Sequence, residues 1–169
     1  MINSQAVLTV NESELYQYNA EATDPDGDAI QYSLGTAPVT MTIDAQTGLI
    51  SWSPNFESAG NHSVVIQATD PEGLFGIQSY TLDVSNINRA PIVSSSAITL
   101  GTENTSYSYD VEAMDPDDDA LTYSLTNSPA GMTIDAQAGL ITWTPSYESA
   151  GTHSVSIAVS PLCQNSCRL

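Results

Sequence analysis

The sequence predicts an all-β chain that folds as two tandem antiparallel β-sandwiches, and three observations predict it. Apolar and polar residues alternate with a period of two in a series of short runs. Gly, Pro, Asp and Asn separate these runs, and no segment keeps a helical period. The chain also repeats itself, so its 169 residues divide into two small domains rather than one.

The repeat has an offset of 91 residues and is free of gaps over its clearest part. Residues 16–68 and 107–159 share 32 identities in 53 positions. The longest identical segment is Met41–Gln46, which recurs as Met132–Gln137. We therefore predict one module at residues 1–88 and a second at 89–169, each an immunoglobulin-type sandwich of about seven short strands.

The strands of the first module are predicted from alternation and from their β-branched and aromatic residues. In order, they are centred on Tyr16–Ala22, Ile30–Leu34, Ile50–Trp52, Val64–Ala68 and Tyr80–Val84. Turns are predicted between them, at Asp24–Asp28, Thr47–Gly48, Ala59–Asn61 and Asp70–Gly73. The tyrosines recur on alternating positions in both repeats, which is typical of core residues rather than of a sugar-stacking surface. Trp52 and Trp143 are each expected to anchor a core.

The second module leaves the repeat register after Ser160. It has no equivalent of the last strand, Ile77–Val84, and reads instead as Pro161–Leu169. We expect this C-terminally incomplete module to be marginally stable by itself or to borrow a strand from a partner, because a missing edge strand exposes backbone groups and core.

The charge excludes several classes of function. The chain has 20 Asp and Glu but only two basic residues, Arg89 and Arg168, which gives a formal net charge of -18. Binding of nucleic acid or of an anionic membrane surface needs cations, so both are disfavoured. No apolar run is long enough to insert into a bilayer, and the N-terminal residues lack the features of a signal peptide.

The acidic residues cluster in two loops, Asp24-Pro25-Asp26-Gly27-Asp28 and Asp115-Pro116-Asp117-Asp118-Asp119. Carboxylates this close repel one another unless a cation lies between them. Ca²⁺ takes about six to eight oxygen ligands, several of which such a loop supplies at once. The alternative is a solvated acidic turn, because Asp, Pro and Gly favour turns in any case.

The chain resembles a known family over nearly its whole length. Ala22–Asp28 followed by Ile30–Leu34, then Ile43-Asp44 to Ile50, then Val64 to Asp70, resembles a cadherin-type repeat. The resemblance is closest to dystroglycan-type cadherin-like and He_PIG-type modules of prokaryotic surface proteins. It implies Ca²⁺ at the module ends and a structural or adhesive role.

The resemblance also implies a set of metal ligands, which match the family pattern one position at a time. They are Glu12, Asp24, Asp26, Asp28, Glu57, Asp70, Asn88, Glu103, Asp115, Asp117, Asp119 and Glu148. Glu12, Glu57 and Asn88 would meet Asp115 and Asp117 at the junction, whereas the Asp24–Asp28 loop and Asp70 would face a preceding module. Two residues depart from the pattern: Arg89 brings a cation to the junction, and Pro161 stands where the second repeat would carry the equivalent of Asp70.

Other residues offer little chemistry. His62 and His153 share one repeat position, which favours a structural role over a Ser-His-Asp site. The paired carboxylates lie on turns without a pocket-forming insertion, so we expect no enzyme. Cys163 and Cys167 form a C-x₃-C pair, which is either a tight disulfide or two free thiols.

The sequence therefore predicts a calcium-binding structural or adhesion module of a multi-repeat extracellular or cell-surface protein whose parent is membrane-associated. Its expected partners are neighbouring repeats of the same chain and a protein or glycan ligand at the cell surface. The alternatives are a carbohydrate-binding accessory module of a secreted glycan-active enzyme and a passive spacer without metal.

Overall fold

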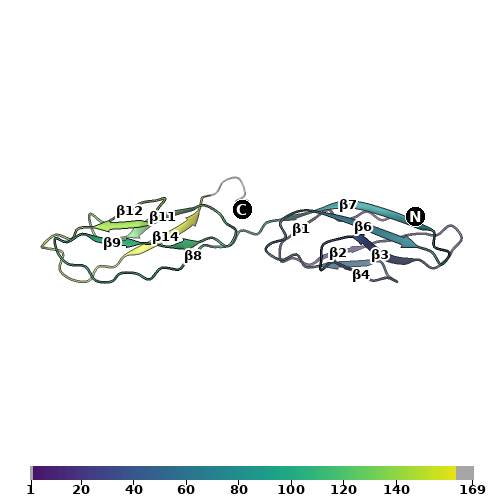
Figure 1. The fold of residues 1–169 in the computed structure, drawn as a ribbon, viewed down its shortest axis with the longest axis horizontal. Helices are drawn as coiled ribbons and strands as arrows, with labels where there is room; N and C mark the ends of the chain where they lie inside the picture. Colours follow the sequence, from purple (N-terminus) through teal and green to yellow (C-terminus); the bar gives the residue numbers. More distant parts are fainter. Residues whose placement is uncertain (1, 163–169) are drawn as a thin grey trace. The chain divides into compact units, whose positions relative to one another are not determined.

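A computed structural model describes residues 2–162 and shows an all-β chain, as predicted, with no helix among these residues (Figure 1). The chain divides into two compact units, unit 1 at Met1–Ile87 and unit 2 at Asn88–Leu169. No segment of the described range forms a helix long and apolar enough to cross a membrane. Cys163 and Cys167 lie outside the described residues.

Unit 1 is a sandwich of two sheets. The first has four strands in the order β1 (Thr9–Asn11), β7 (Phe75–Ser85), β6 (Gly60–Thr69) and β3 (Gln31–Thr36). The second has three strands in the order β2 (Tyr16–Asn19), β5 (Leu49–Trp52) and β4 (Thr42–Ile43). All pairs are antiparallel except β1 with β7, which is parallel. The five alternating runs of the sequence are confirmed as strands, and β1 and β4 are additions that alternation did not indicate.

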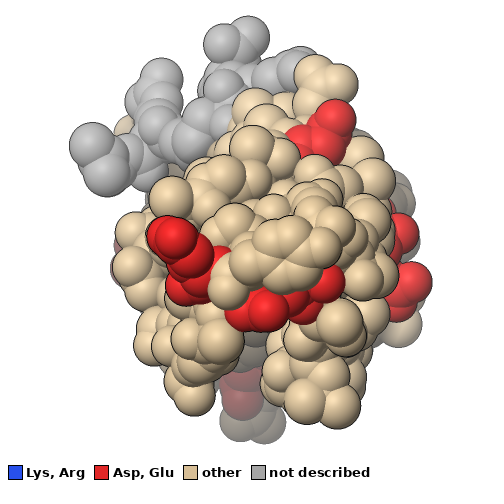
Figure 2. Space-filling view, turned by 90° about the vertical axis from the view of Figure 1, so that its left-hand side faces the viewer, with Lys and Arg blue, Asp and Glu red and all other residues tan. Residues whose placement is uncertain are grey.

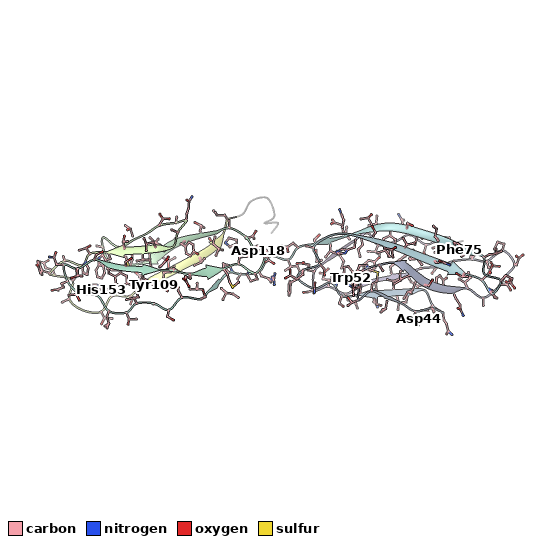
Figure 3. All side chains as sticks on the ribbon, in the orientation of Figure 1. Asp44, Trp52, Phe75, Tyr109, Asp118 and His153 are labelled. Atoms are coloured by element: carbon pink, nitrogen blue, oxygen red, sulfur yellow. The ribbon has the colours of Figure 1, made fainter. Side chains whose placement is uncertain are left out.

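The core of unit 1 consists of the inward residues of those alternating runs. Ile50, Val64, Ile66 and Leu82 are fully buried, and Trp52 is 5% exposed. Figure 3 labels Trp52 in unit 1. Burying side chains of this size contributes about 1.5–3 kcal/mol each, so these strands supply most of the folding energy of the unit. The indole N–H of Trp52 donates to Thr40 Oγ1 at 3.0 Å, which satisfies the one polar atom that its burial removes from water.

A tight turn at Asp44–Gly48 connects β4 to β5. The carboxylate Oδ1 of Asp44 accepts hydrogen bonds from the backbone N–H groups of Gln46 and Thr47, at 3.0 and 2.8 Å. Gly48 has a φ of +75°, and a Cβ added there would lie 2.3 Å from the carbonyl oxygen of Ala20. Only glycine fits this position, because the turn packs directly against the chain that follows β2.

Unit 2 repeats this plan, and its pairings are all antiparallel. β9 (Tyr107–Asp110), β13 (Leu140–Trp143) and β12 (Thr133–Ile134) correspond to β2, β5 and β4. β11 (Leu121–Asn127) pairs with β14 (Ser156–Pro161) as β3 pairs with β6. A further short pair joins β8 (Ile92–Val93) to β10 (Ala113–Met114).

Within residues 88–162, unit 2 has no counterpart of β1, and the repeat position of β7 lies outside the described residues. The buried core of unit 2 consists of Tyr109, Val111, Tyr123 and Ile141. Trp143 is only half-buried, unlike Trp52, which differs from the expectation that both tryptophans anchor a core.

Candidate metal sites in the acidic loops

The first acidic loop joins β2 to β3 and is stabilised by hydrogen bonds within its own turn. Asp24 Oδ1 accepts from the backbone N–H groups of Asp26 at 2.8 Å and Asp28 at 3.4 Å. The side chains of Asp26 and Asp28 are exposed. The loop therefore uses one carboxylate to fix its own backbone and leaves two in contact with solvent.

Strand pairing brings a further carboxylate to the same end of unit 1. Gln31, at the start of β3, pairs with Thr69, at the end of β6. Asp70 follows directly and therefore lies at the same end of unit 1 as the Asp24–Asp28 loop, although the two are far apart in sequence. Its Oδ1 accepts from the N–H of Leu74 at 2.9 Å, within the turn that leads to β7.

The second acidic loop is bound by a positively charged side chain, that of Arg89. The Arg89 Nε donates to Asp117 Oδ1 at 2.8 Å, its backbone N–H donates to Asp117 Oδ2 at 2.6 Å, and its Nη2 lies 2.7 Å from Oδ1. Nη2 also donates to the carbonyl oxygen of Pro116 at 2.5 Å. These hydrogen bonds lower the pKa of the Asp117 carboxyl below its usual value. Both carboxylate oxygens of Asp117 are thus engaged by Arg89.

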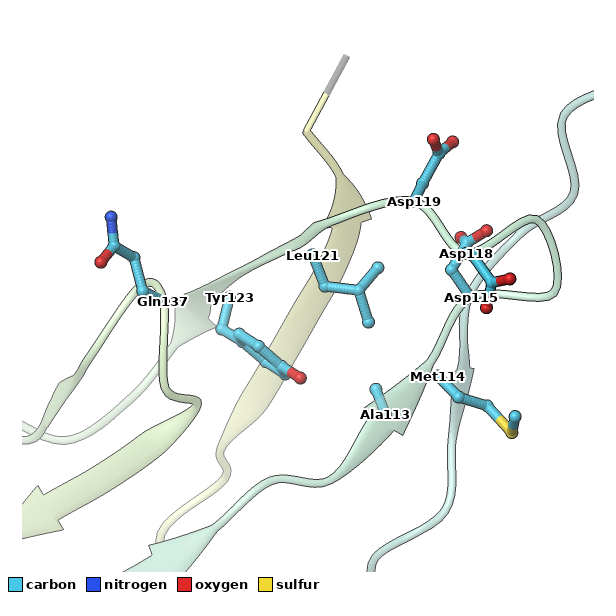
Figure 4. Close-up of a pocket in the computed structure, with 8 residues that line it drawn as sticks. All are labelled: Ala113, Met114, Asp115, Asp118, Asp119, Leu121, Tyr123 and Gln137. Atoms are coloured by element: carbon cyan, nitrogen blue, oxygen red, sulfur yellow. The ribbon is translucent and has the colours of Figure 1, made fainter. Parts of the chain in front are cut away.

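Asp115 lies at the base of the same loop beside an open pocket of about 380 Å³ (Figure 4). It is 6% exposed; its Oδ1 accepts from the N–H of Asp117 at 2.8 Å, and its buried Oδ2 has no hydrogen-bond partner. Asp118 and Asp119 also line this pocket, but the side chain of Asp119 extends away from the other two in Figure 4.

Glu12, a predicted ligand, is fully buried and accepts two backbone hydrogen bonds. Its Oε1 accepts from the N–H of Ala59 at 3.0 Å, and its Oε2 accepts from the N–H of Ile87 at 3.0 Å. It therefore ties the segment that precedes β6 to the segment that follows β7. The repeat counterpart, Glu103, has a buried Oε1 without a hydrogen-bond partner.

The remaining predicted ligands lie at the surface. Asn88, Glu57 and Glu148 are exposed, and the backbone N–H groups of the two glutamates donate to Asn55 Oδ1 and Ser146 Oγ in matching turns. Figure 2 shows acidic but no basic side chains on the face that it presents. The surface is therefore one that attracts cations in general.

The fit of these residues to Ca²⁺ differs between the loops. Within residues 2–162, no group of three or more Asp, Glu, His or Cys side chains is arranged to hold a metal ion. The second loop does not fit, because Arg89 already occupies both oxygens of Asp117. The first loop offers only oxygen donors, and unit 1 contains neither Lys nor Arg, so its chemistry is the one that suits Ca²⁺.

The other sequence candidates prove structural. His62 and His153 each form a hydrogen bond through Nε2 to the serine carbonyl four residues earlier, at 2.7 and 2.8 Å. Their rings pack edge-on against Trp52 and Trp143, with centroids 5.0 and 5.2 Å apart. The tyrosines that might stack on a sugar are core residues as predicted: Tyr16, Tyr18, Tyr109 and Tyr123 are all buried.

The fold and its loops define a class of protein: tandem modules of immunoglobulin-like, cadherin-like β-sandwich type. The chain belongs to the family described as "Putative Ig domain" (He_PIG), whose model matches residues 1–85 and 90–164. Such modules are structural units, and the chain has two of them.

Comparison with known proteins agrees with this assignment. Over 82 residues the chain is 32% identical to "Integrin beta-like protein A" of Dictyostelium discoideum, a match that covers 46% of the chain and only 4% of that protein. A human protocadherin-24 EC1-2 structure has a TM-score of 0.61 at 16% identity, over 92% of this chain and 84% of that one. Extracellular cadherin domains 3-6 of protocadherin gamma B2 give 0.60 at 15% identity, over 94% and 47%. At these identities the structural matches show the fold.

Proposed function

We propose that the chain is a non-catalytic segment of an extracellular or cell-surface adhesion array, and that Ca²⁺ binds to the acidic end of unit 1. Its partners would be neighbouring repeats of the same protein and a protein or glycan ligand at the cell surface. The family membership supports a modular, structural role. The similarity to an integrin beta-like protein and to extracellular cadherin domains supports the location and the adhesive role.

One observation carries the calcium proposal. The pairing of Gln31 with Thr69 places Asp70 at the same end of unit 1 as the Asp24–Asp28 loop, in a unit with 11 acidic residues and no Lys or Arg. The mutual repulsion of these carboxylates has no internal cation to offset it, in contrast to the second loop with Arg89. A divalent cation would therefore stabilise this end of unit 1.

Thermal unfolding with and without Ca²⁺ tests the proposal. At a Ca²⁺ concentration about ten times the dissociation constant, binding adds about 1.4 kcal/mol to the stability. For a unit of this size the gain corresponds to a rise of about 5–10 °C in the melting temperature, reversed by a chelator. We expect the rise to disappear in the variant Asp26→Asn/Asp28→Asn.

The second loop provides the matched control, Asp117→Asn. This variant should keep the full calcium response of unit 1, because Asp117 is bound by Arg89 and belongs to the other unit. Absence of both a thermal shift and a binding heat at millimolar Ca²⁺ would refute calcium binding and leave the passive spacer.

A further inference from the structure

The two acidic loops form the same backbone turn. In each loop the first Asp, Asp24 or Asp115, accepts through Oδ1 from the backbone N–H two residues later, at 2.8 Å. The N–H of the fourth loop residue donates to the carbonyl oxygen of the first, at 3.3 Å in both loops. The first loop forms this turn in a unit without Lys or Arg. Arg89 is therefore not needed to shape the turn of the second loop, and its contribution lies in its charge.

Arg89 binds the second loop through the kinds of oxygen atom that Ca²⁺ takes as ligands. Its Nε and Nη2 lie 2.8 and 2.7 Å from Asp117 Oδ1, and its backbone N–H donates to Asp117 Oδ2 at 2.6 Å. Nη2 also donates to the carbonyl oxygen of Pro116. Carboxylate and backbone carbonyl oxygens are the usual ligands of Ca²⁺. The Asp117 side chain is only 5% exposed, so Arg89 holds oxygens that a metal ion would need.

The loop nevertheless keeps an oxygen that Arg89 does not use. Asp115 is 6% exposed, and its buried Oδ2 has no hydrogen-bond partner among the residues that the structure describes. A buried carboxylate oxygen without a donor is costly. The loop also carries an excess of negative charge, since Asp115, Asp117, Asp118 and Asp119 share a single guanidinium. The second loop therefore retains a ligand and a charge that suit a cation, although Arg89 blocks Asp117.

We propose that Arg89 replaces a divalent cation in the second acidic loop. It acts as a built-in counter-ion, which makes this end of unit 2 independent of Ca²⁺, and it closes a latent metal site that would use Asp115 and Asp117. A guanidinium suits this role because its planar set of N–H donors matches a carboxylate and its charge is permanent. The inference concerns unit 2 alone and holds whether or not unit 1 binds Ca²⁺.

Removal of the guanidinium should turn the loop into a calcium site. The test background carries Asp26→Asn/Asp28→Asn, which weakens the first loop as a competitor, and Trp52→Phe, so that only Trp143 reports unfolding. With Arg89 present, unit 2 should melt at the same temperature with and without millimolar Ca²⁺. Arg89→Ala should melt at a lower temperature without Ca²⁺. It should recover about 5–10 °C at a Ca²⁺ concentration about ten times the dissociation constant.

Further variants identify the ligand that Arg89 leaves unused. In the Arg89→Ala chain, Asp115→Asn should abolish the calcium response, because it removes the negative charge of the buried carboxylate. The matched control Glu112→Gln, at an exposed position of the same unit, should keep the response. Calorimetry should detect an additional bound Ca²⁺ in Arg89→Ala compared with its parent, and this binding should disappear with Asp115→Asn.

A measurement on the unaltered chain tests the proposal even where Arg89→Ala does not fold. The backbone amide NMR signals of Arg89 and of residues 115–119 should stay in place as Ca²⁺ is raised to millimolar concentration. Saturable shifts of these signals would overturn the proposal, and so would an Arg89→Ala chain that Ca²⁺ does not stabilise. The signals of Asp24–Asp28 report calcium binding by unit 1 separately, so a failure of that proposal is distinguishable from a failure of this one.

Discussion

Replacing Glu12 by Ala should severely destabilise unit 1, whereas the same change at its repeat counterpart Glu103 should be almost neutral. The two residues occupy one repeat position and differ in their hydrogen bonds. Glu12 is fully buried and accepts two backbone N–H groups, each at 3.0 Å. Glu103 has a buried oxygen without a partner.

The magnitude follows from what each truncation leaves behind. Glu12→Ala removes the hydrogen bonds from the N–H groups of Ala59 and Ile87, and a hydrogen bond to a charged group contributes about 1.5–3 kcal/mol. The expected loss is about 2–5 kcal/mol, or about 10 °C or more in melting temperature. Glu12→Gln keeps one acceptor oxygen and should lose about half as much. Glu103→Ala should change stability by less than about 1 kcal/mol, because it removes an oxygen that lacks a donor.

The assay uses the single tryptophan of each unit. Urea unfolding followed by fluorescence reports unit 1 through Trp52 when Trp143 is replaced by Phe, which avoids treating a two-unit chain as one transition. Glu103 variants are followed through Trp143 in a background with Trp52 replaced by Phe, so that only unit 2 reports.

Equal losses of unfolding free energy in Glu12→Ala and Glu103→Ala would refute the reasoning. The two glutamates would then act through their charge or their position in the loop, and not through their hydrogen bonds. A loss for Glu12→Ala that appears only when Ca²⁺ is present would equally show that Glu12 acts as a metal ligand rather than as a backbone acceptor.

Three further changes test the structure of unit 1. Gly48→Ala should lower the free energy of unfolding, measured with urea, by more than about 2 kcal/mol, because the added Cβ would meet the carbonyl oxygen of Ala20. Gly27 has a similar φ of +85°, but nothing lies within 4 Å of an added Cβ. Gly27→Ala should therefore cost only the backbone strain of about 1–2 kcal/mol. Leu82→Ala should cost about 2–5 kcal/mol, measured in the same way, because it empties a fully buried site. Asp44→Asn should lower the melting temperature at neutral pH, and the gap to the parent chain should close as the pH falls below about 4. The N–H groups of Thr47 and Gln46 lower the pKa of Asp44, so its stabilising effect is present above the unfolded-state pKa and is lost as the pH falls through the folded-state pKa. A constant gap down to pH 2 would contradict this assignment.

The strands with clear alternation could be predicted from the sequence, because each buries one face in a local pattern. Tyr16 and Tyr18, or Val64 and Ile66, give the period directly. The parallel pairing of β1 with β7 could not be predicted in this way, since Thr9 and Asp83 are joined only by tertiary contact.

The roles of the acidic residues were harder to predict than their positions. Spacing placed Asp24 and Asp117, and the family resemblance placed Glu12, among possible metal ligands, and the structure shows that each of them accepts hydrogen bonds from protein donors. A carboxylate that accepts backbone N–H groups and one that binds a cation look the same in sequence, because both need only an acid on a turn. Arg89 was one of the two residues that depart from the family pattern, and the structure shows that it binds Asp117.

Arg89 also provides a trypsin cleavage site at the boundary between the two units. Trypsin cuts after Lys and Arg, and the chain has no Lys and one other Arg, at position 168. A cut after Arg89 would separate unit 1 from nearly all of unit 2. Because the guanidinium is held by Asp117 and Pro116, it must leave them before it can enter a protease pocket. The rate of this cut therefore measures how often the second acidic loop releases its arginine.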